Sequence, residues 1–126
     1  MADAKKILIA DDEPNIVISL EFLMKREGFQ VVVAVDGEEA LVKIRTETPD
    51  LVLLDVMMPK KSGFEVCQEV KADPALAATR ILMLTAKGRD TEMAKGLALG
   101  ADAYVTKPFS TKDLVDKVRE LLGAPA

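Results

Sequence analysis

The stretch LVLLDVMM, residues 51–58, combines a run of apolar side chains with a single carboxylate, Asp55. The run Leu51–Leu54 is continuous rather than alternating, which is typical of a strand covered on both faces. Aspartate is rarely buried unless it is paired, because removing a carboxylate from water is costly. An acid at the end of such a strand therefore either caps a turn or takes part in chemistry there.

Four more apolar runs occur at similar intervals along the chain. The predicted strands are Ile7–Ala10, Val31–Val35, Leu51–Leu54, Ile81–Leu84 and Ala103–Val105. Segments with helical periodicity follow each strand, and their starts are expected at Pro14, Asp36, Ser62, Asp90 and Ser110 or Thr111. This alternation predicts an α/β fold, a single doubly wound domain whose parallel sheet is covered by helices on both faces.

The helix starts differ in the strength of their signals. Asp36 with Glu39, and Ser62 with Glu65, form capping boxes. Asp90 is a candidate N-cap for the fourth helix, but that helix contains Gly96, which costs about 1 kcal/mol relative to alanine. We therefore expect the fourth helix to have low local stability.

The composition excludes several classes of function. The chain has 126 residues, no histidine, one cysteine and a net charge of −4. The lack of histidine rules out Ser-His-Asp and Cys-His catalysis, His-based metal sites and a phosphohistidine carrier. The negative charge argues against nucleic-acid binding. The lone Cys67 and the lack of a membrane-length apolar stretch or signal peptide predict a cytoplasmic protein without a membrane partner.

Polar residues follow four of the five predicted strands. They are Asp11 and Asp12 after the first strand, Asp55 after the third, Thr85 after the fourth and Lys107 after the fifth. Ligands of open α/β sheets bind at the carboxyl ends of the strands, so these side chains are expected at one edge. Asp11 and Asp12 alone would be interpreted as caps of the next helix. Their coincidence with the other three favours a functional site.

Three carboxylates in one cleft need compensation. Two like charges 4 Å apart repel by roughly 4 kcal/mol at an effective dielectric constant near 20, so either one acid is protonated or a cation neutralises the cluster. Oxygen ligands without histidine or cysteine suit Mg²⁺, for which Mn²⁺ should substitute. One acid could then act as a nucleophile toward a phosphoryl group whose oxygens face Mg²⁺, Lys107 and Thr85.

These residues resemble the receiver domain of bacterial two-component response regulators, the CheY-like family. The resemblance is carried by ILIADDEP, PDLVLLDVMMPKKSGFEV, ILMLTAK and GADAYVTKPF, and it covers about residues 5–122 of a single domain spanning residues 1–126. It implies a flavodoxin-like (βα)5 fold with strand order 2-1-3-4-5. It also implies a signalling domain rather than an enzyme, one that catalyses only its own phosphorylation and dephosphorylation.

The resemblance implies a role for each residue of the acidic cluster. Asp55 matches the phosphoacceptor, which receives a phosphoryl group from a sensor histidine kinase or a histidine phosphotransfer protein. Asp12, Asp55 and the backbone carbonyl of Met57 would bind Mg²⁺ directly, whereas Asp11 would bind it through water. Lys107 would pair with Asp55 or with its phosphoryl group.

Further positions match residues that control switching and phosphoryl lifetime. Thr85 matches the switch hydroxyl, and Tyr104 matches the aromatic switch residue, although Tyr104 alone would be interpreted as a core aromatic. Pro108 matches a cis-proline, although alone it would be an ordinary loop proline. Met57 and Lys87 lie where the family adjusts phosphoryl lifetime. Neither is an acid or amide that could orient water, so we predict a moderately long-lived phosphoryl group.

The resemblance also implies an output face formed by the fourth helix, fifth strand and fifth helix. This face would contact a downstream partner or output domain, and its mixed charges fit a homodimer as well as a solvated surface. The sequence leaves open the cognate kinase, the pathway and the oligomeric state. A stand-alone receiver and one domain of a longer regulator both remain open.

Three other functions fit the sequence less well. An aspartate-nucleophile phosphatase would need a second acid where Met57 stands. A nucleotide- or flavin-binding module would need a glycine-rich loop where DDEPN follows the first strand. A degenerate receiver that only mediates contacts would lack site residues, and here all five are present.

Overall fold

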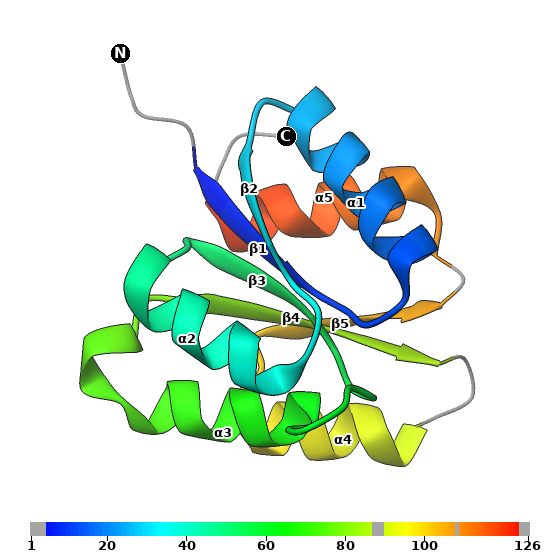
Figure 1. The fold of residues 1–126 in the computed structure, drawn as a ribbon. Helices are drawn as coiled ribbons and strands as arrows, with labels where there is room; N and C mark the ends of the chain where they lie inside the picture. The colour runs from blue at the N-terminus through cyan, green and yellow to red at the C-terminus, as the bar shows by residue number, and fades with distance from the viewer. Residues whose placement is uncertain (1–4, 87–89, 108, 124–126) are drawn as a thin grey trace.

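The computed structural model of the protein describes residues 5–86, 90–107 and 109–123. Five strands alternate with five helices, as predicted (Figure 1). The strands are β1 (Lys6–Ala10), β2 (Gln30–Ala34), β3 (Leu51–Asp55), β4 (Arg80–Ala86) and β5 (Ala103–Lys107). The helices are α1 (Pro14–Arg26), α2 (Gly37–Glu47), α3 (Gly63–Ala72), α4 (Asp90–Ala98) and α5 (Thr111–Leu121), with a short 3-10 turn η1 (Pro74–Leu76) before β4.

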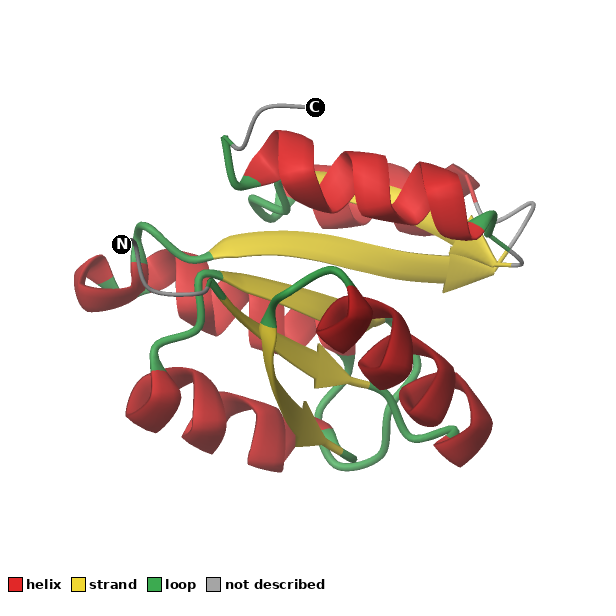
Figure 2. Cartoon of the chain, turned by 90° about the horizontal axis from the view of Figure 1, so that it is seen from above, coloured by secondary structure: helices red, strands yellow, loops and turns green. Residues whose placement is uncertain are grey.

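The sheet confirms the predicted topology. Its strand order is β2-β1-β3-β4-β5, and every neighbouring pair is parallel. Figure 2 shows the strands running in one general direction and fanning out with the twist of the sheet. The connection after β1 leads to β2 on one side of the sheet, whereas the connection after β3 leads to β4 on the other side. Because these two connections run in opposite directions, they leave an opening at the carboxyl ends of β1 and β3.

Side chains of the central strands alternate between two cores. On β3, Val52 and Leu54 join the core beneath α2 and α3, whereas Leu51 and Leu53 join the core beneath α1 and α5. Figure 1 shows α1 and α5 together on one face of the sheet and α2, α3 and α4 on the other. The period of two residues along the strand therefore produces a three-layer α/β/α sandwich.

Burial distinguishes the central strands from the edge strands. All residues of β3 are buried, and so are Ile81–Thr85 of β4. In β2 only Ala34 is buried, and in β5 no residue is. The prediction that all five runs are covered on both faces is therefore wrong for β5, whereas Val31 and Val32 of β2 pack into opposite cores and are only partly buried. Each of these two strands has a neighbour on one side only, and the helices wrap around the middle of the sheet.

The predicted helix caps are found with small shifts in boundary. Asp36 and Ser62 accept hydrogen bonds from the backbone N–H groups of Glu39 and Glu65, at 2.8 and 3.3 Å. Of the two candidates for α5, Ser110 is the N-cap. α4 begins at Asp90 itself, one residue earlier than a helix capped by Asp90 would begin. No described helix is long and apolar enough to span a membrane.

Candidate functional site at the carboxyl edge of the sheet

The sequence-predicted site residues converge at the carboxyl ends of the strands. Asp11 directly follows β1, Asp55 is the last residue of β3 and Lys107 is the last residue of β5. Asp55 pairs in register with Leu84, so Thr85 lies one residue further along β4 than the partner of Asp55. The parallel register therefore brings together residues that are far apart in the sequence.

The three aspartates form one cluster. Oxygen atoms of Asp11, Asp12 and Asp55 all lie within 4.8 Å of one another. Asp11 is fully buried, Asp55 nearly so, and Asp12 is exposed. Asp11 Oδ1 accepts a hydrogen bond from the backbone N–H of Glu13 at 2.9 Å, which holds this carboxylate in place. A compact set of carboxylate oxygens open to solvent on one side suits a hard divalent cation such as Mg²⁺.

The alternative that Asp11 and Asp12 only cap the next helix does not describe their contacts. The N-cap residue of α1 is Glu13, whose own side chain makes no cap hydrogen bond, and Asp11 bonds to the Glu13 N–H through Oδ1 alone. The second oxygen of Asp11, Oδ2, accepts a hydrogen bond from Lys107 Nζ at 3.1 Å. Its contacts therefore tie it to the cluster and to β5.

Lys107 is the cation of the site. Its Nζ lies 3.1 Å from Asp11 Oδ2, 3.3 Å from Asp55 Oδ1 and 3.7 Å from Glu13 Oε1. Burial acts to lower the pKa of Lys107, but the charges and hydrogen bonds of Asp55 and Asp11 more than offset this effect and raise it. Lys107 is therefore a fixed positive charge shared between two acids, of which Asp11 is the nearer.

One lysine does not compensate the buried acids. Burial, and next the charge of Asp11, raise the pKa of Asp55 to about 6 even though Lys107 acts to lower it. An ordinary aspartate has a pKa near 3.8, so the site disfavours the ionised form of Asp55. A divalent cation beside the cluster would supply the missing positive charge, and the residues present therefore fit Mg²⁺ on electrostatic grounds.

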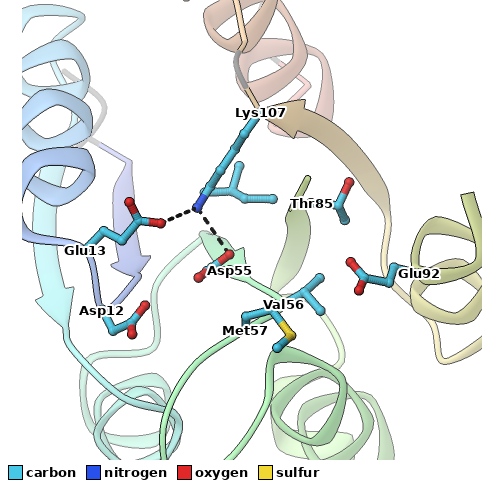
Figure 3. A pocket seen from close by; sticks show the side chains of 9 residues that line it. Asp12, Glu13, Asp55, Val56, Met57, Thr85, Glu92 and Lys107 are labelled. Atoms are coloured by element: carbon cyan, nitrogen blue, oxygen red, sulfur yellow. Dashed lines mark hydrogen bonds and ion pairs between the residues drawn. The ribbon is translucent and has the colours of Figure 1, made fainter. Parts of the chain in front are cut away.

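A cavity of about 310 Å³ lies beside Asp55. Its lining residues are Asp12, Glu13, Asp55, Val56, Met57, Leu84, Thr85, Glu92 and Lys107. Figure 3 shows Lys107 reaching to Asp55 and Glu13, with Thr85 and Glu92 on the opposite side of this space. The cavity gives a ligand access to a carboxylate that is otherwise almost fully buried.

Thr85 contributes an unsatisfied hydroxyl to the site. It is 1% exposed, and its Oγ1 has no hydrogen-bond partner among the described residues. A buried hydroxyl without a partner costs about 1–3 kcal/mol. Such a group commonly marks a functional position rather than a structural one.

The remaining predicted residues are placed as follows. Tyr104 is 40% exposed on the edge strand β5, which excludes a plain core aromatic. Met57 is 70% exposed and lines the cavity. Lys87 and Pro108 lie outside the described residues, so the predictions made for them stay predictions.

Two acids of the site were not predicted from the sequence. Glu13 follows the aspartate pair directly, and its place in DDEP could have indicated it. Glu92 comes from α4, 37 positions after Asp55 in the chain, and no local pattern distinguishes it from a surface glutamate. The structure shows that α4, as well as the strand ends, lines the cavity.

The sheet order, the acidic cluster and the threonine and lysine at the same edge together define the receiver class of signalling domain. The chain belongs to the response regulator receiver domain family, whose model matches residues 7–119. Its role is therefore in two-component signalling, and the resemblance inferred from the sequence is confirmed.

Individual relatives agree with this assignment. The alkaline phosphatase synthesis transcriptional regulatory protein PhoP of Bacillus subtilis is 48% identical over 118 residues, which are 94% of this chain and 48% of PhoP. The phosphate regulon transcriptional regulatory protein PhoB of Rhizobium meliloti is 40% identical over 117 residues, 93% of this chain and 52% of PhoB. The chain thus spans about half the length of these curated relatives.

Solved structures give the same result. A CheY-like response regulator receiver domain protein from Methanospirillum hungatei superposes with a TM-score of 0.89 at 31% identity, covering 96% of this chain and 95% of that one. The chemotaxis protein CheY4 of Vibrio cholerae superposes with a TM-score of 0.88 at 31% identity, covering 94% of this chain and 99% of that one. Both cover nearly the whole chain.

Proposed function

We propose that Asp55 accepts a phosphoryl group from the phosphohistidine of a sensor histidine kinase or a histidine phosphotransfer protein, in a Mg²⁺-dependent reaction. The observation that carries this proposal is the nearly buried Asp55 carboxylate, which faces a cavity between two further acids and Lys107. The proposed unit is one cytoplasmic receiver domain spanning residues 1–126, and it acts as a signalling domain rather than as an enzyme with an external substrate.

The reaction is a displacement at phosphorus. An oxygen of the Asp55 carboxylate forms a bond to the phosphorus atom, the P–N bond of the donor breaks, and the donor histidine leaves with the electron pair. The raised pKa of Asp55, about 6, still leaves it mostly ionised at pH 7.5 and able to attack. In the separate dephosphorylation step, water attacks the same phosphorus atom, the P–O bond to Asp55 breaks, and inorganic phosphate leaves while the carboxylate is restored.

Four groups would hold Mg²⁺: Asp12 and Asp55 by their carboxylates, Met57 by its backbone carbonyl and Asp11 through water. Mn²⁺ should substitute, because both ions take oxygen ligands in octahedral geometry. When bound, the ion supplies positive charge to the oxygens of the phosphoryl group. Asp11 keeps Lys107 at the cluster, since its Oδ2 lies only 3.1 Å from the Lys107 Nζ.

Lys107 and Thr85 then recognise the product. Lys107 Nζ, 3.3 Å from Asp55 Oδ1, is placed to pair with a phosphoryl oxygen once Asp55 carries it. Thr85 has a buried hydroxyl without a partner among the described residues, and a phosphoryl oxygen would provide one. A dianionic phosphoryl group on Asp55 would thus attract the Thr85 hydroxyl toward it.

The signal leaves the domain through α4, β5 and α5. Thr85 belongs to β4, β4 pairs with β5, and Tyr104 is exposed on β5. Two packings of these elements would then be biased by the phosphoryl group. The recipient is a downstream protein, an output domain or, through the same face, a second copy of the chain.

Intact mass tests the proposal. The parent, Asp55→Asn and Asp50→Asn are incubated with acetyl phosphate in the presence of Mg²⁺ or EDTA. Asp50 is the matched control, because it precedes the same strand at the opposite edge and accepts a hydrogen bond from Lys6 N. We expect one added phosphoryl group in the parent and in Asp50→Asn with Mg²⁺, and none in Asp55→Asn or with EDTA. Equal labelling of Asp55→Asn would refute the assignment of Asp55.

A further inference from the structure

The loop between β3 and α3, residues 56–62, carries the Met57 carbonyl and begins directly after Asp55. Any group that fixes this loop also fixes one of the proposed Mg²⁺ ligands, the Met57 carbonyl, relative to Asp55 at the end of β3. The loop runs past the N-termini of two helices, α2 and α3, and each of these helices begins with a glycine.

Gly63 holds the two ends of the loop together. Its N–H donates to the carbonyl of Val56 at 2.9 Å. A Cβ at this position would collide with the carbonyl oxygen of Asp55 and would lie 3.0 Å from the Cα of Val56. The first turn of α3 therefore packs directly on the backbone of the phosphoacceptor.

Gly37 makes the equivalent contact from α2 to the middle of the loop. Its N–H donates to the carbonyl of Pro59 at 3.2 Å. A Cβ on Gly37 would collide with the carbonyl oxygen of Lys61 and would lie 2.7 Å from its carbonyl carbon. The obstacle is backbone, which cannot rotate away as a side chain could.

The backbone conformation of Gly37 does not itself require glycine. Gly37 is the first helical residue of α2, and it is not among the residues with positive φ. Alanine is a better helix former than glycine at such a place. The closeness of the loop, rather than the conformation of the helix, is what excludes a larger residue.

The neighbouring residues support the same contact. Asp36 uses Oδ1 to cap α2, while its Oδ2 lies 3.7 Å from Lys60 Nζ. Lys60 has a φ of 71°, a left-handed conformation that is unfavourable for a residue with a side chain. The turn at Pro59–Lys61 is thus held in an unfavourable shape against the N-terminus of α2.

We infer that Gly37 is a positioning residue for the phosphorylation site: by letting the backbone of residues 59–61 lie against α2, it sets the position of the Met57 carbonyl relative to Asp55. This inference rests on the proposed function, because it concerns the same Mg²⁺ ligands. It adds α2, which contributes no ligand of its own, to the elements that determine metal affinity.

The test compares Gly37→Ala with Gly28→Ala. Gly28 has a φ of 92° and nothing within 4 Å of an added Cβ, so its substitution strains the protein without touching the loop. Mg²⁺ affinity is measured by calorimetry on metal-free protein, together with the free energy of unfolding. Partners that orient ligands typically change metal affinity by about 10–100-fold. We expect about tenfold weaker Mg²⁺ binding for Gly37→Ala and less than twofold change for Gly28→Ala.

A second readout does not depend on the metal. In metal-free protein, the amides of Lys61 and Gly63 donate within the loop, at 2.8 and 2.9 Å. We expect both to exchange with solvent faster in Gly37→Ala and at the parental rate in Gly28→Ala. If the parent gains no phosphoryl group, the proposed function fails, but these exchange rates still decide the role of Gly37.

Two results would overturn the inference. One is a folded Gly37→Ala variant whose Mg²⁺ affinity and amide exchange rates equal those of the parent. The other is a Gly28→Ala variant of equal stability that loses as much Mg²⁺ affinity as Gly37→Ala does. Both variants are measured with trimethylamine N-oxide, which favours the folded state. If Gly37→Ala still does not fold, Lys60→Met is used. Removing the Lys60 charge should by itself strengthen Mg²⁺ binding, whereas release of the loop of residues 56–62 should weaken it. Stronger or unchanged Mg²⁺ binding in Lys60→Met would therefore also overturn the inference.

Discussion

The acids at the two ends of the strands have opposite electrostatic surroundings. At the carboxyl edge, Asp11, Asp12 and Asp55 share Lys107, and burial with the neighbouring charges raises the pKa of Asp55 to about 6. At the amino edge, a single acid has three donors. Asp102 accepts from Lys71 Nζ at 3.0 Å, from Arg80 Nη1 at 3.4 Å and from the backbone N–H of Ile81 at 2.7 Å.

The difference separates a structural polar cluster from a functional one. Asp102 connects α3, β4 and the start of β5, and its contacts leave little for a ligand to add. Among the described residues, the carboxyl edge instead has an excess of negative charge and a Thr85 hydroxyl without a hydrogen-bond partner, both of which a cation and a phosphoryl group would relieve. Three pairs of substitutions test whether polar residues at the amino ends of the strands mainly stabilise the fold, whereas those at the carboxyl ends mainly serve function.

The largest effect on stability is expected at the amino edge. Asp102→Ala leaves the Ile81 N–H without its acceptor and removes the carboxylate that pairs with Lys71, whose ammonium keeps the Thr79 carbonyl. We expect it to reduce the free energy of unfolding by about 3 kcal/mol. Denaturant unfolding measures this change, with Asp116→Ala as control, because the Asp116–Lys112 pair is exposed. Phosphorylation by acetyl phosphate should remain. Loss of phosphorylation in folded Asp102→Ala would contradict the division between the edges.

The second prediction concerns Asp55, whose replacement should raise the free energy of unfolding rather than lower it. The folded pKa of Asp55, about 6, lies above its ordinary value of 3.8. The contribution of Asp55 to stability is therefore complete below pH 3.8 and is lost as pH rises through 6. In metal-free protein, the free energy of unfolding of Asp55→Asn minus that of the parent should rise by about 2–3 kcal/mol from pH 4 to pH 8, because each unit of pKa shift corresponds to about 1.36 kcal/mol.

Urea unfolding of both proteins in EDTA at the two pH values measures this difference, in which the contributions of groups that do not interact with Asp55 cancel. Asp50→Asn, at the amino end of the same strand, should lose a little stability, because its amide oxygen accepts from Lys6 N more weakly than the Asp50 carboxylate does at 2.8 Å. A parent that gains stability relative to Asp55→Asn toward pH 8 would contradict the electrostatic account of the site.

The smallest effect compares two buried threonines at the two ends of β4. Thr79 precedes the strand and donates from Oγ1 to the carbonyl of Pro49 at 3.5 Å, whereas Thr85 Oγ1 has no partner among the described residues. Thr85→Val should therefore raise the free energy of unfolding by about 1 kcal/mol, and Thr79→Val should lower it by a similar amount. Thermal unfolding of both variants is the measurement, and a loss of stability in Thr85→Val would show that its hydroxyl has a structural partner.

The sequence predicted the fold well because the signals are local. Continuous apolar runs marked the strands to within one or two residues, and the capping residues Asp36 and Ser62 marked the starts of α2 and α3. Strand order came from the resemblance to the receiver family. Periodicity cannot distinguish a central strand from an edge strand of similar composition, so the partial exposure of β2 and β5 was missed.

The site was predicted in part for the same reason. Residues at strand ends can be found in the sequence, because parallel strands bring those ends to one edge. Glu92 lines the cavity from α4, and Gly37 contacts the loop of residues 56–62 from α2. Both contacts depend on how helices pack across the sheet, which no local pattern describes. Lys107 was expected to pair with Asp55, and in the structure it pairs with Asp11 as well.

The reach of Lys107 has a mechanical consequence. β5 is hydrogen bonded only to β4, yet its last side chain contacts Asp55 of β3 and Asp11 next to β1. With strands about 4.8 Å apart, β5 and β1 are separated by three spacings, or roughly 14 Å in a flat sheet. Lys107 is thus a tether across the sheet, and any movement of its ammonium toward a new anion on Asp55 pulls on the end of β5. We expect the proposed phosphoryl group on Asp55 to act in this way on the end of an edge strand.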